Sequence, residues 1–320
     1  MGHHRHQHDP KTGDAQLFWA VVANLSLTVI EIGGGLLSGR LALIADAVHN
    51  FFDAVSLNIA YFARTIAHRP ADENMTFGYG RAEVVAALVN YLSLIFVGFY
   101  LIYEAGTRFL NPSNVDGWIV VAVAGVALVV DILTAFLTFS LSKHSMNIRA
   151  AFLHNLADAL GSIAVILVGT LILLFDWRLI DPFVTLLIAS YILWISFSEI
   201  GSAIRILMLA RPDGLDVDAV LGEILTIDGV ASAHHLHLWQ MQEHEAALDS
   251  HIVIEAERWN DADTIKQAVK ARLQSACGIT HTTLELECSQ HACKNPITIG
   301  HARDASADKV APDTKHDLPA

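Results

Sequence analysis

Six long apolar stretches fill most of the first two thirds of this 320-residue chain and limit what it can fold into. A helix needs about 20 apolar residues to cross the hydrocarbon core of a bilayer, and each stretch is near that length. Only 17% of the residues are charged, against about 25% in soluble domains. Short links between the stretches predict antiparallel neighbours in one six-helix transmembrane bundle. The predicted spans are 17–37, 41–64, 83–104, 117–140, 150–174 and 179–203.

Lysine and arginine residues near the span ends predict the orientation of the bundle, because they are enriched in cytoplasmic loops. Nine fall on one side and three on the other, so we expect a multi-pass protein of the inner (plasma) membrane with both termini in the cytoplasm. The nine are Arg5, Lys11, Arg64, Arg69, Arg81, Lys143, Arg149, Arg205 and Arg211, and the three are Arg40, Arg108 and Arg178.

The pattern changes after Arg211, where Pro212-Asp213-Gly214 marks a boundary and the chain becomes typical of a soluble domain. Asp216 can cap a helix that runs to about residue 226, and Asp261 or Asp263 can cap a second one to about residue 275. Alternating segments at 233–241, 246–256 and 280–287 predict strands. The order α-β-β-α-β predicts a small ferredoxin-like, metallochaperone-like α+β domain.

These patterns divide the chain into four expected segments. They are a His-rich cytoplasmic tail at 1–15, the transmembrane domain at 16–209, the cytoplasmic domain at 210–290 and a disordered tail at 291–320. The first tail contains His3, His4, His6 and His8 without apolar periodicity. A loose metal-collecting tail and a plain solvated end both remain open as interpretations.

Two short polar strings interrupt spans two and five. They are His49-Asn50-Phe51-Phe52-Asp53 and His154-Asn155-Leu156-Ala157-Asp158. Each places a His and an Asp four residues apart, so both side chains project from one face of a helix. Ionisable groups in a bilayer cost about 3 kcal/mol each, and four of them at matching spacing predict a buried site.

Two imidazole nitrogens and two carboxylate oxygens form a tetrahedral set that suits Zn²⁺. Mg²⁺ and Ca²⁺ prefer more oxygen ligands, whereas Cd²⁺ and Co²⁺ are further candidates. Metal binding to such groups releases protons, so a site open alternately to each side would be a proton-coupled antiporter. The alternative interpretation is that these His and Asp side chains form hydrogen bonds between helices and bind no metal. We interpret Asp46, Asn50 and Asn155 as residues that support the metal ligands or contact other helices, and not as ligands.

The chain resembles the cation diffusion facilitator family, in particular its zinc-transporting bacterial type. The matching stretches are 38–53, 77–83, 147–162 and 234–239, the last being His234-His235-Leu236-His237-Leu238-Trp239. The resemblance covers about residues 15–290. It implies a homodimer, a six-helix domain with a cytoplasmic metallochaperone-like domain, and efflux by zinc/proton exchange. It also implies that the transport ligands are His49, Asp53, His154 and Asp158.

The resemblance further implies a cytoplasmic zinc site, structural or regulatory, with His234, His251 and Glu287 as candidate ligands and His281 and Glu285 as further ones. In the loop between spans two and three, some members bind an ion with an acid and two histidines. Here Asp72 is accompanied by Met75 and Tyr79, which argues against that site.

Several function classes are disfavoured. The net charge of −13 makes nucleic acid an unfavourable partner. No His-Glu-x-x-His motif is present, and four ligands would close the intramembrane site, so we expect a transporter and not an enzyme. A metal sensor without transport remains an alternative. Cys288, His291 and Cys293 match no strong zinc signature, and we interpret them as part of a plain tail.

Overall fold

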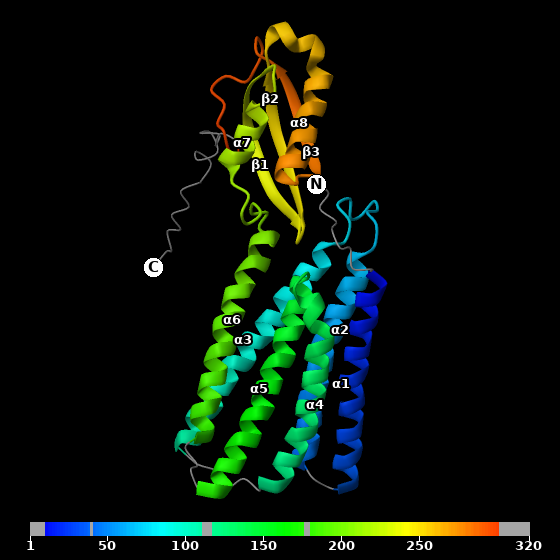
Figure 1. The fold of residues 1–320 in the computed structure, drawn as a ribbon, viewed down its shortest axis with the longest axis vertical. Helices are drawn as coiled ribbons and strands as arrows, with labels where there is room; N and C mark the ends of the chain where they lie inside the picture. The colour runs from blue at the N-terminus through cyan, green and yellow to red at the C-terminus, as the bar shows by residue number, and fades with distance from the viewer. Residues whose placement is uncertain (1–9, 39–40, 111–116, 176–179, 301–320) are drawn as a thin grey trace, which may run out of the picture. The chain divides into compact units, whose positions relative to one another are not determined.

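The computed structural model describes residues 10–38, 41–110, 117–175 and 180–300, in two compact units, Met1–Met208 and Leu209–Ala320 (Figure 1). Six long helices make up the described part of the first unit, one at each predicted span. The predicted fold class, a helical membrane bundle followed by a small α+β domain, is confirmed. The helices are α1 (Pro10–Ser38), α2 (Leu41–Ala67), α3 (Arg81–Leu110), α4 (Gly117–Ser142), α5 (Met146–Phe175) and α6 (Ile180–Leu207).

The first helix begins earlier than its predicted span. Pro10 opens α1, and proline suits a first turn because the N–H that it lacks would have no partner in the helix. The histidines of the N-terminal tail lie in residues 1–9, outside the described part of the chain. Three described segments are long and apolar enough to cross a membrane, namely Arg81–Thr107, Gly125–Ser142 and Pro182–Leu207.

Helix α5 takes part in two apolar cores of the first unit. Through Ile148 and Ala151 it packs with α1 and with Leu57 and Ala60 of α2. Through Leu153 and neighbouring residues it packs with α3 and α6. Small alanine side chains let the α2 and α5 backbones approach closely. One helix therefore presents two separate faces, and both strings of polar residues lie on helices that touch.

Large aromatic side chains cover the outside of α3 and α6. Phe96 and Tyr103 on α3 and Trp194 on α6 are all strongly exposed in the isolated chain. A water-soluble surface rarely carries so many large apolar groups on neighbouring helices. Contact with lipid or with a second protein accounts for these faces in a membrane-spanning bundle.

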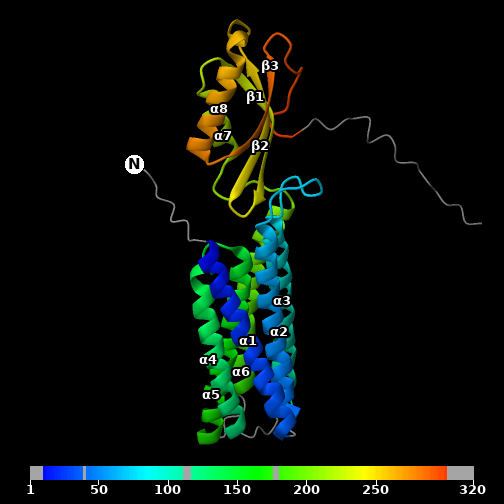
Figure 2. The ribbon, with the colours of Figure 1, turned by 90° about the vertical axis from the view of Figure 1, so that its right-hand side faces the viewer.

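The second unit has the predicted α-β-β-α-β order. Its three strands lie in the order β1-β2-β3, with β1 and β2 antiparallel and β2 and β3 parallel. The two helices cover one face of this sheet (Figure 2), and the core between them includes Ile224, Leu248, Ile252, Val269 and Leu273. The elements are α7 (Val217–Leu225), β1 (Val230–Gln242), β2 (Glu245–Ile254), the 3-10 helix η1 (Ala256–Asp261), α8 (Ala262–Cys277) and β3 (His281–Cys288).

The ends of these elements differ in detail from the sequence prediction. The short helix η1 begins at Ala256, where the predicted second strand ends, and it was not predicted. Asp216 and Asp261 are the N-cap residues of α7 and α8, as predicted, but neither side chain makes a capping hydrogen bond. Asp261 instead accepts a hydrogen bond of 2.9 Å from Nε of Arg258.

Residues 289–300, which we call the return segment, fold back onto the sheet. The Ser289 N–H donates to the Ile254 carbonyl at 2.9 Å. Farther along, the carbonyls of Ile297 and Thr298 accept hydrogen bonds from the N–H groups of His235 and Leu236 at 3.0 and 2.9 Å. This differs from the disordered tail expected from residue 291, because β1 offers a free edge whose donors can pair with it. Residues 301–320 lie outside the described part.

Candidate metal sites

The polar string on α5 has the predicted geometry. His154 is buried, and its Nε2 lies 3.8 Å from Oδ2 of Asp158, one helical turn further on. Only 13% of the Asp158 side chain is exposed. An imidazole and a carboxylate are thus held together inside the bundle on one face of α5, as their four-residue spacing predicts.

The second half of the predicted quartet belongs to α2. His49 and Asp53 lie within that helix, as do Asp46 and Asn50, but their side chains fall outside the described part of the structure. The contact between the two helices is described. Nδ2 of Asn147 on α5 donates a 2.8 Å hydrogen bond to the backbone carbonyl of Ala60 on α2.

Other buried polar residues of the bundle connect helices or bond within one. Asn90 on α3 donates to the Ser56 carbonyl on α2 at 3.3 Å. Ser162 on α5 lies 3.5 Å from Oδ2 of the buried Asp131 on α4. Asn155 bonds the backbone of its own helix, from Nδ2 to the Ala151 carbonyl at 2.8 Å. Asn90 and Ser162 thus contact neighbouring helices, whereas this bond of Asn155 stays within α5.

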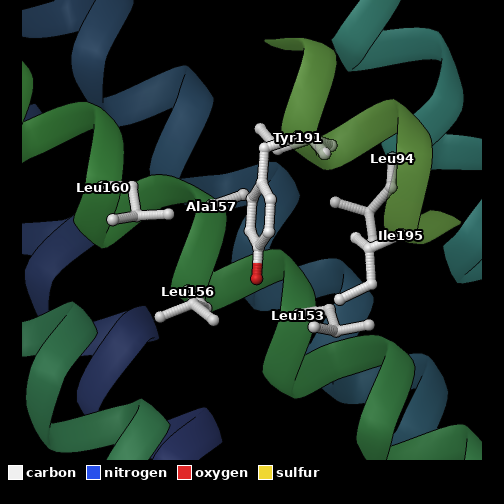
Figure 3. A pocket seen from close by; sticks show the side chains of 8 residues that line it. Leu94, Leu153, Leu156, Ala157, Leu160, Tyr191 and Ile195 are labelled. Atoms are coloured by element: carbon white, nitrogen blue, oxygen red, sulfur yellow. The ribbon is translucent and has the colours of Figure 1, made fainter. Parts of the chain in front are cut away.

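A small pocket between α3, α5 and α6 is unsuited to an ion. Leu153, Leu156 and Leu160 line it from α5, on a different face from His154 and Asp158. Figure 3 shows the Tyr191 hydroxyl entering this space among leucine side chains. A metal ion needs several charged or strongly polar ligands, so the pocket is apolar packing space and not a candidate site.

In the loop between α2 and α3, the Asp72 carboxylate accepts hydrogen bonds from other residues of the same loop. Oδ1 of Asp72 accepts the N–H groups of Asn74 and Met75 at 2.8 and 2.9 Å, and Oδ2 accepts the Tyr79 hydroxyl at 2.7 Å. The Tyr79 hydroxyl, followed by these two N–H groups, lowers the pKa of Asp72 below its ordinary value. The residues that replace the two histidines of the family pattern thus help to close a turn around the carboxylate.

The second unit brings together the three residues that the resemblance implied. His234 on β1 pairs with His251 on β2 across the antiparallel ladder. Nδ1 of His251 lies 2.7 Å from Oε1 of Glu287, and Nε2 of His234 lies 3.5 Å from the same oxygen. Oε2 of Glu285 also lies 3.2 Å from Nε2 of His251. His281 is the first residue of β3, where it pairs with Ala247, and it belongs to neither of the two groups of potential metal ligands among the described residues.

Glu287 is held as a carboxylate. Burial favours its neutral form, but the Cys293 N–H, the His251 ring and the Cys293 thiol donate to it. With the nearby His234 they outweigh burial and lower the pKa of Glu287 to about 2. Glu287 is therefore ionised at neutral pH and carries the charge that a divalent cation needs.

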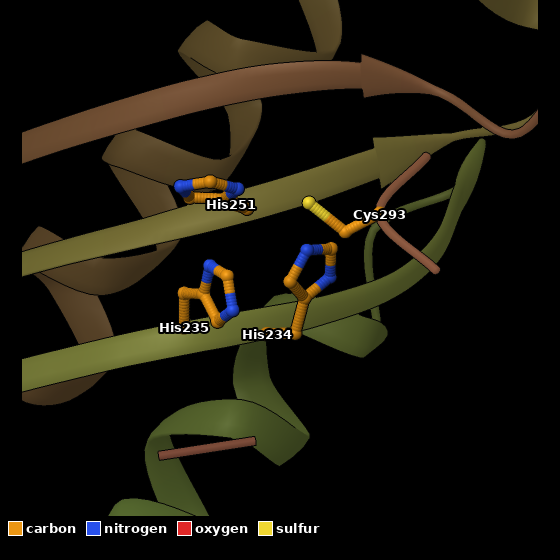
Figure 4. A group of neighbouring side chains, drawn as sticks. All are labelled: His234, His235, His251 and Cys293. Atoms are coloured by element: carbon orange, nitrogen blue, oxygen red, sulfur yellow. The ribbon is translucent and has the colours of Figure 1, made fainter. Parts of the chain in front are cut away.

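Two residues that the sequence did not single out as ligands lie in the same cluster. Figure 4 shows His234, His235, His251 and Cys293 converging beside β1 and β2, and one potential ligand atom from each lies within 4.8 Å of the others. Sγ of Cys293 also lies 3.2 Å from Oε1 of Glu287, and this carboxylate raises the pKa of the thiol. Strand alternation would put His235 on the opposite face, and no spacing signature marks Cys293.

Comparison with protein families gives two matches that cover most of the chain. The family model described as the cation efflux transmembrane domain matches residues 17–208. The model of the cation efflux protein cytoplasmic domain matches residues 212–288.

Similar curated proteins extend over nearly the same length. A cadmium, cobalt and zinc/H(+)-K(+) antiporter of Bacillus subtilis is 34% identical, over 91% of this chain and 94% of its own. The zinc transporter ZitB of Pectobacterium atrosepticum is 33% identical, over 94% and 97%. The human proton-coupled zinc antiporter SLC30A2 is 32% identical, over 87% and 78%. The polar string on α5, the helix pair that carries both strings, the metallochaperone-like domain and these matches agree, and the chain belongs to the cation efflux (cation diffusion facilitator) family of membrane transporters.

Proposed function

We propose that this chain is a proton-coupled antiporter that exports Zn²⁺ from the cytoplasm, with Cd²⁺ and Co²⁺ as further substrates. The ion would bind in the membrane between His49 and Asp53 of α2 and His154 and Asp158 of α5. The names of the Bacillus, Pectobacterium and human relatives support the substrate class and the exchange with protons.

The contact between α2 and α5 is the observation that carries this proposal. The two helices are antiparallel, because two spans, α3 and α4, lie between them along the chain, and the bond from Asn147 to Ala60 fixes their register. Asp53 lies seven residues before Ala60 and His154 seven residues after Asn147. At about 1.5 Å per residue, both positions are about 10 Å from this bond and therefore level with each other.

The same calculation places His49 and Asp158 at one level of the bundle. His49 lies eleven residues before Ala60, and Asp158 lies eleven residues after Asn147, so both are about 16 Å from the bond. Positions 60, 57, 53 and 49 follow one another at three- and four-residue spacing, as do 147, 151, 154 and 158. Such positions share a helix face, and Leu57, Ala60 and Ala151 of these two stripes lie in the common core.

The donor set explains why exchange with protons is expected. Two carboxylates neutralise one dication, and two imidazoles complete a tetrahedral shell at about 2.0–2.2 Å. When the metal leaves, the same four groups can hold protons, so each ion bound displaces protons and each protonation favours metal release. A site that holds either cargo, but not both, couples the two gradients.

Orientation and assembly are part of the same proposal. Nine Lys and Arg residues against three support cytoplasmic termini in the inner (plasma) membrane. A homodimer is supported by the match to the cytoplasmic domain of the family and by the exposed aromatic faces of α3 and α6. In the cytoplasmic domain, His234, His251 and Glu287 would hold a further zinc ion with a structural or regulatory role.

Transport into sealed vesicles tests the proposal. The purified chain is reconstituted with a zinc-sensitive dye inside, and a pH gradient is imposed. We expect Zn²⁺ to accumulate against the proton flow, and Asp53→Asn or Asp158→Asn to slow the initial rate about tenfold or more.

A matched control is Asp131→Asn, which changes another buried aspartate of the bundle outside the quartet and should retain transport. Zinc uptake indifferent to the pH gradient would contradict the coupling. Wild-type uptake by Asp158→Asn, with the protein folded as judged by gel filtration, would contradict the site.

A further inference from the structure

We propose that Cys293 and His235 complete, with His234 and His251, a thiolate-containing metal site in the cytoplasmic domain that the return segment closes. It builds on the cytoplasmic site proposed above, with which it shares two histidines. The four residues offer one ligand atom each within 4.8 Å, the compactness of a single coordination sphere (Figure 4). The ion would be a borderline-soft divalent cation such as Zn²⁺, Cd²⁺ or Co²⁺.

His234 is the first reason to place a ligand here. Its side chain is 4% exposed, and neither ring nitrogen has a hydrogen-bond partner among the described residues. The nearest charged atom is Oε1 of Glu287 at 3.5 Å. Buried polar groups are almost always hydrogen-bonded, and an imidazole that is not, and that faces three other potential ligands, is well placed for a metal ion.

The backbone of β1 is distorted where the two adjacent histidines lie. The β1–β2 ladder shifts register between His234 and His237, and His235 has a positive φ of 50°, uncommon for a residue other than glycine. In a regular strand the two rings would point to opposite faces. The bulge instead brings both towards His251, with ring centroids 5.2 Å from His234 and 4.7 Å from His235. Strain of this kind concentrates at functional sites.

The return segment holds the cysteine over these rings. The Cys293 N–H donates to Oε2 of Glu287 at 3.0 Å, which fixes the start of the segment to β3. Beyond it, the carbonyls of Ile297 and Thr298 accept the N–H groups of His235 and Leu236 in the bulge itself. Cys293 is thus held between its anchor on β3 and the pairing of the return segment with β1, and it is not the free tail thiol that its sequence position suggests.

The chemistry of the site follows from its donor set. Three imidazole nitrogens and one thiolate are a tetrahedral set for zinc, and a thiolate disfavours Mg²⁺ and Mn²⁺. In the metal-free protein the thiol proton is shared with Oε1 of Glu287. When the metal–sulfur bond forms, that proton passes to water, and Glu287 remains beside the cation as a carboxylate. Thiolate and carboxylate together balance the two positive charges.

Cobalt absorption spectroscopy on the full-length protein tests this site. A thiolate bound to Co²⁺ gives a charge-transfer band in the near ultraviolet, while nitrogen and oxygen ligands give only visible bands. The chain has three cysteines, Cys277, Cys288 and Cys293, all beyond the transmembrane helices, so the intramembrane quartet contributes nothing to that band. The background carries Asp53→Asn and Asp158→Asn to weaken binding in the membrane.

We expect a charge-transfer band in this background and its loss in Cys293→Ser, while Cys277→Ser and Cys288→Ser, the matched controls, retain it. His235→Ala should weaken Zn²⁺ affinity about tenfold or more. Zn²⁺ should also protect Cys293 from alkylation, measured by mass spectrometry of each cysteine peptide.

The outcomes separate the two proposals. Visible cobalt bands without a charge-transfer band, or a band that survives Cys293→Ser, overturn the thiolate ligand and leave the site of His234, His251 and Glu287 standing. Visible bands unchanged by His251→Ala and no protection of Cys293 overturn both cytoplasmic sites. None of these results bears on the vesicle assay, which measures the intramembrane site.

Discussion

Asn147 of α5 donates a 2.8 Å hydrogen bond from Nδ2 to the backbone carbonyl of Ala60 in α2. Both residues are completely buried, and the bond joins positions 87 residues apart in the chain. It fixes the vertical register of two antiparallel helices, and with it the level at which their His and Asp residues would meet.

Loss of this bond should therefore affect transport as well as stability. We expect Asn147→Ala to lower the free energy of unfolding by about 1 kcal/mol, the net value of one hydrogen bond, measured by thermal unfolding in detergent. It should also slow Zn²⁺ uptake, because the register of α2 and α5 loosens.

The matched control for that variant is Asn24→Ala. Asn24 on α1 donates a similar buried bond of 3.0 Å to Oγ1 of Thr134 on α4, outside the proposed quartet. Its loss should cost comparable stability while uptake is largely kept. Equal uptake by the two variants would argue against a special role for the α2–α5 register.

Close packing of α3 on α6 predicts a sharp difference between two glycines of α3. A Cβ added at Gly98 would lie 2.7 Å from Cγ of Leu193, whereas one at Gly106 would meet nothing within 4 Å. We expect Gly98→Ala to destabilise the bundle by about 1–3 kcal/mol, as overpacking does. Gly106→Ala should be neutral or slightly stabilising, because alanine favours the helix.

The same thermal unfolding measurement includes a rescue. Leu193→Ala makes room for the added methyl group, so Gly98→Ala should cost less in that background than in the wild type. Additive costs of the two substitutions would show that Gly98 and Leu193 do not contact each other in the protein.

The loop between α2 and α3 predicts a pH effect that can be followed at one residue. The Tyr79 hydroxyl is the largest of the causes that lower the pKa of Asp72, so Tyr79→Phe should raise that pKa towards 3.8. A lowered pKa means that ionised Asp72 stabilises the folded loop above pH 3.8 and that this contribution disappears as the pH falls through the lowered pKa. Carbon-13 NMR titration of the Asp72 carboxyl group measures the shift. An unchanged pKa in Tyr79→Phe would contradict the hydrogen bond.

Local patterns in the sequence were sufficient for the helices, for the order of helices and strands along the cytoplasmic domain and for the proximity of His154 and Asp158 on α5. Apolar runs mark helices that lie in a bilayer, and a His and an Asp four residues apart must share a helix face whatever surrounds them. The resemblance implied His234 and His251, but their pairing across β1 and β2 depends on register shifts that strand alternation does not predict.

The cluster around Cys293 depends on features that no local pattern contains. The bulge that turns His235 breaks the alternation from which the face of a strand residue is predicted. The return segment pairs Leu236 with Ile299, 63 residues apart, across an edge of the sheet that sequence periodicity cannot assign. The sequence contains two adjacent histidines near the start of a strand and a cysteine six residues after Glu287. Their spacing does not indicate that these residues lie close together.

Cysteine cross-linking between α2 and α5 tests the central claim most directly. In a background where Cys277, Cys288 and Cys293 are serine, the pair His49→Cys with Asp158→Cys is treated with a short thiol-bridging reagent, and the intramolecular product is identified by mass spectrometry. The control pair is Asp53→Cys with Leu156→Cys, near the same level but on the apolar face of α5 that lines the pocket with α3 and α6. Efficient cross-linking of the first pair alone is the predicted result. No cross-link between positions 49 and 158, or equal yields from the two pairs, would contradict a metal site shared by these helices.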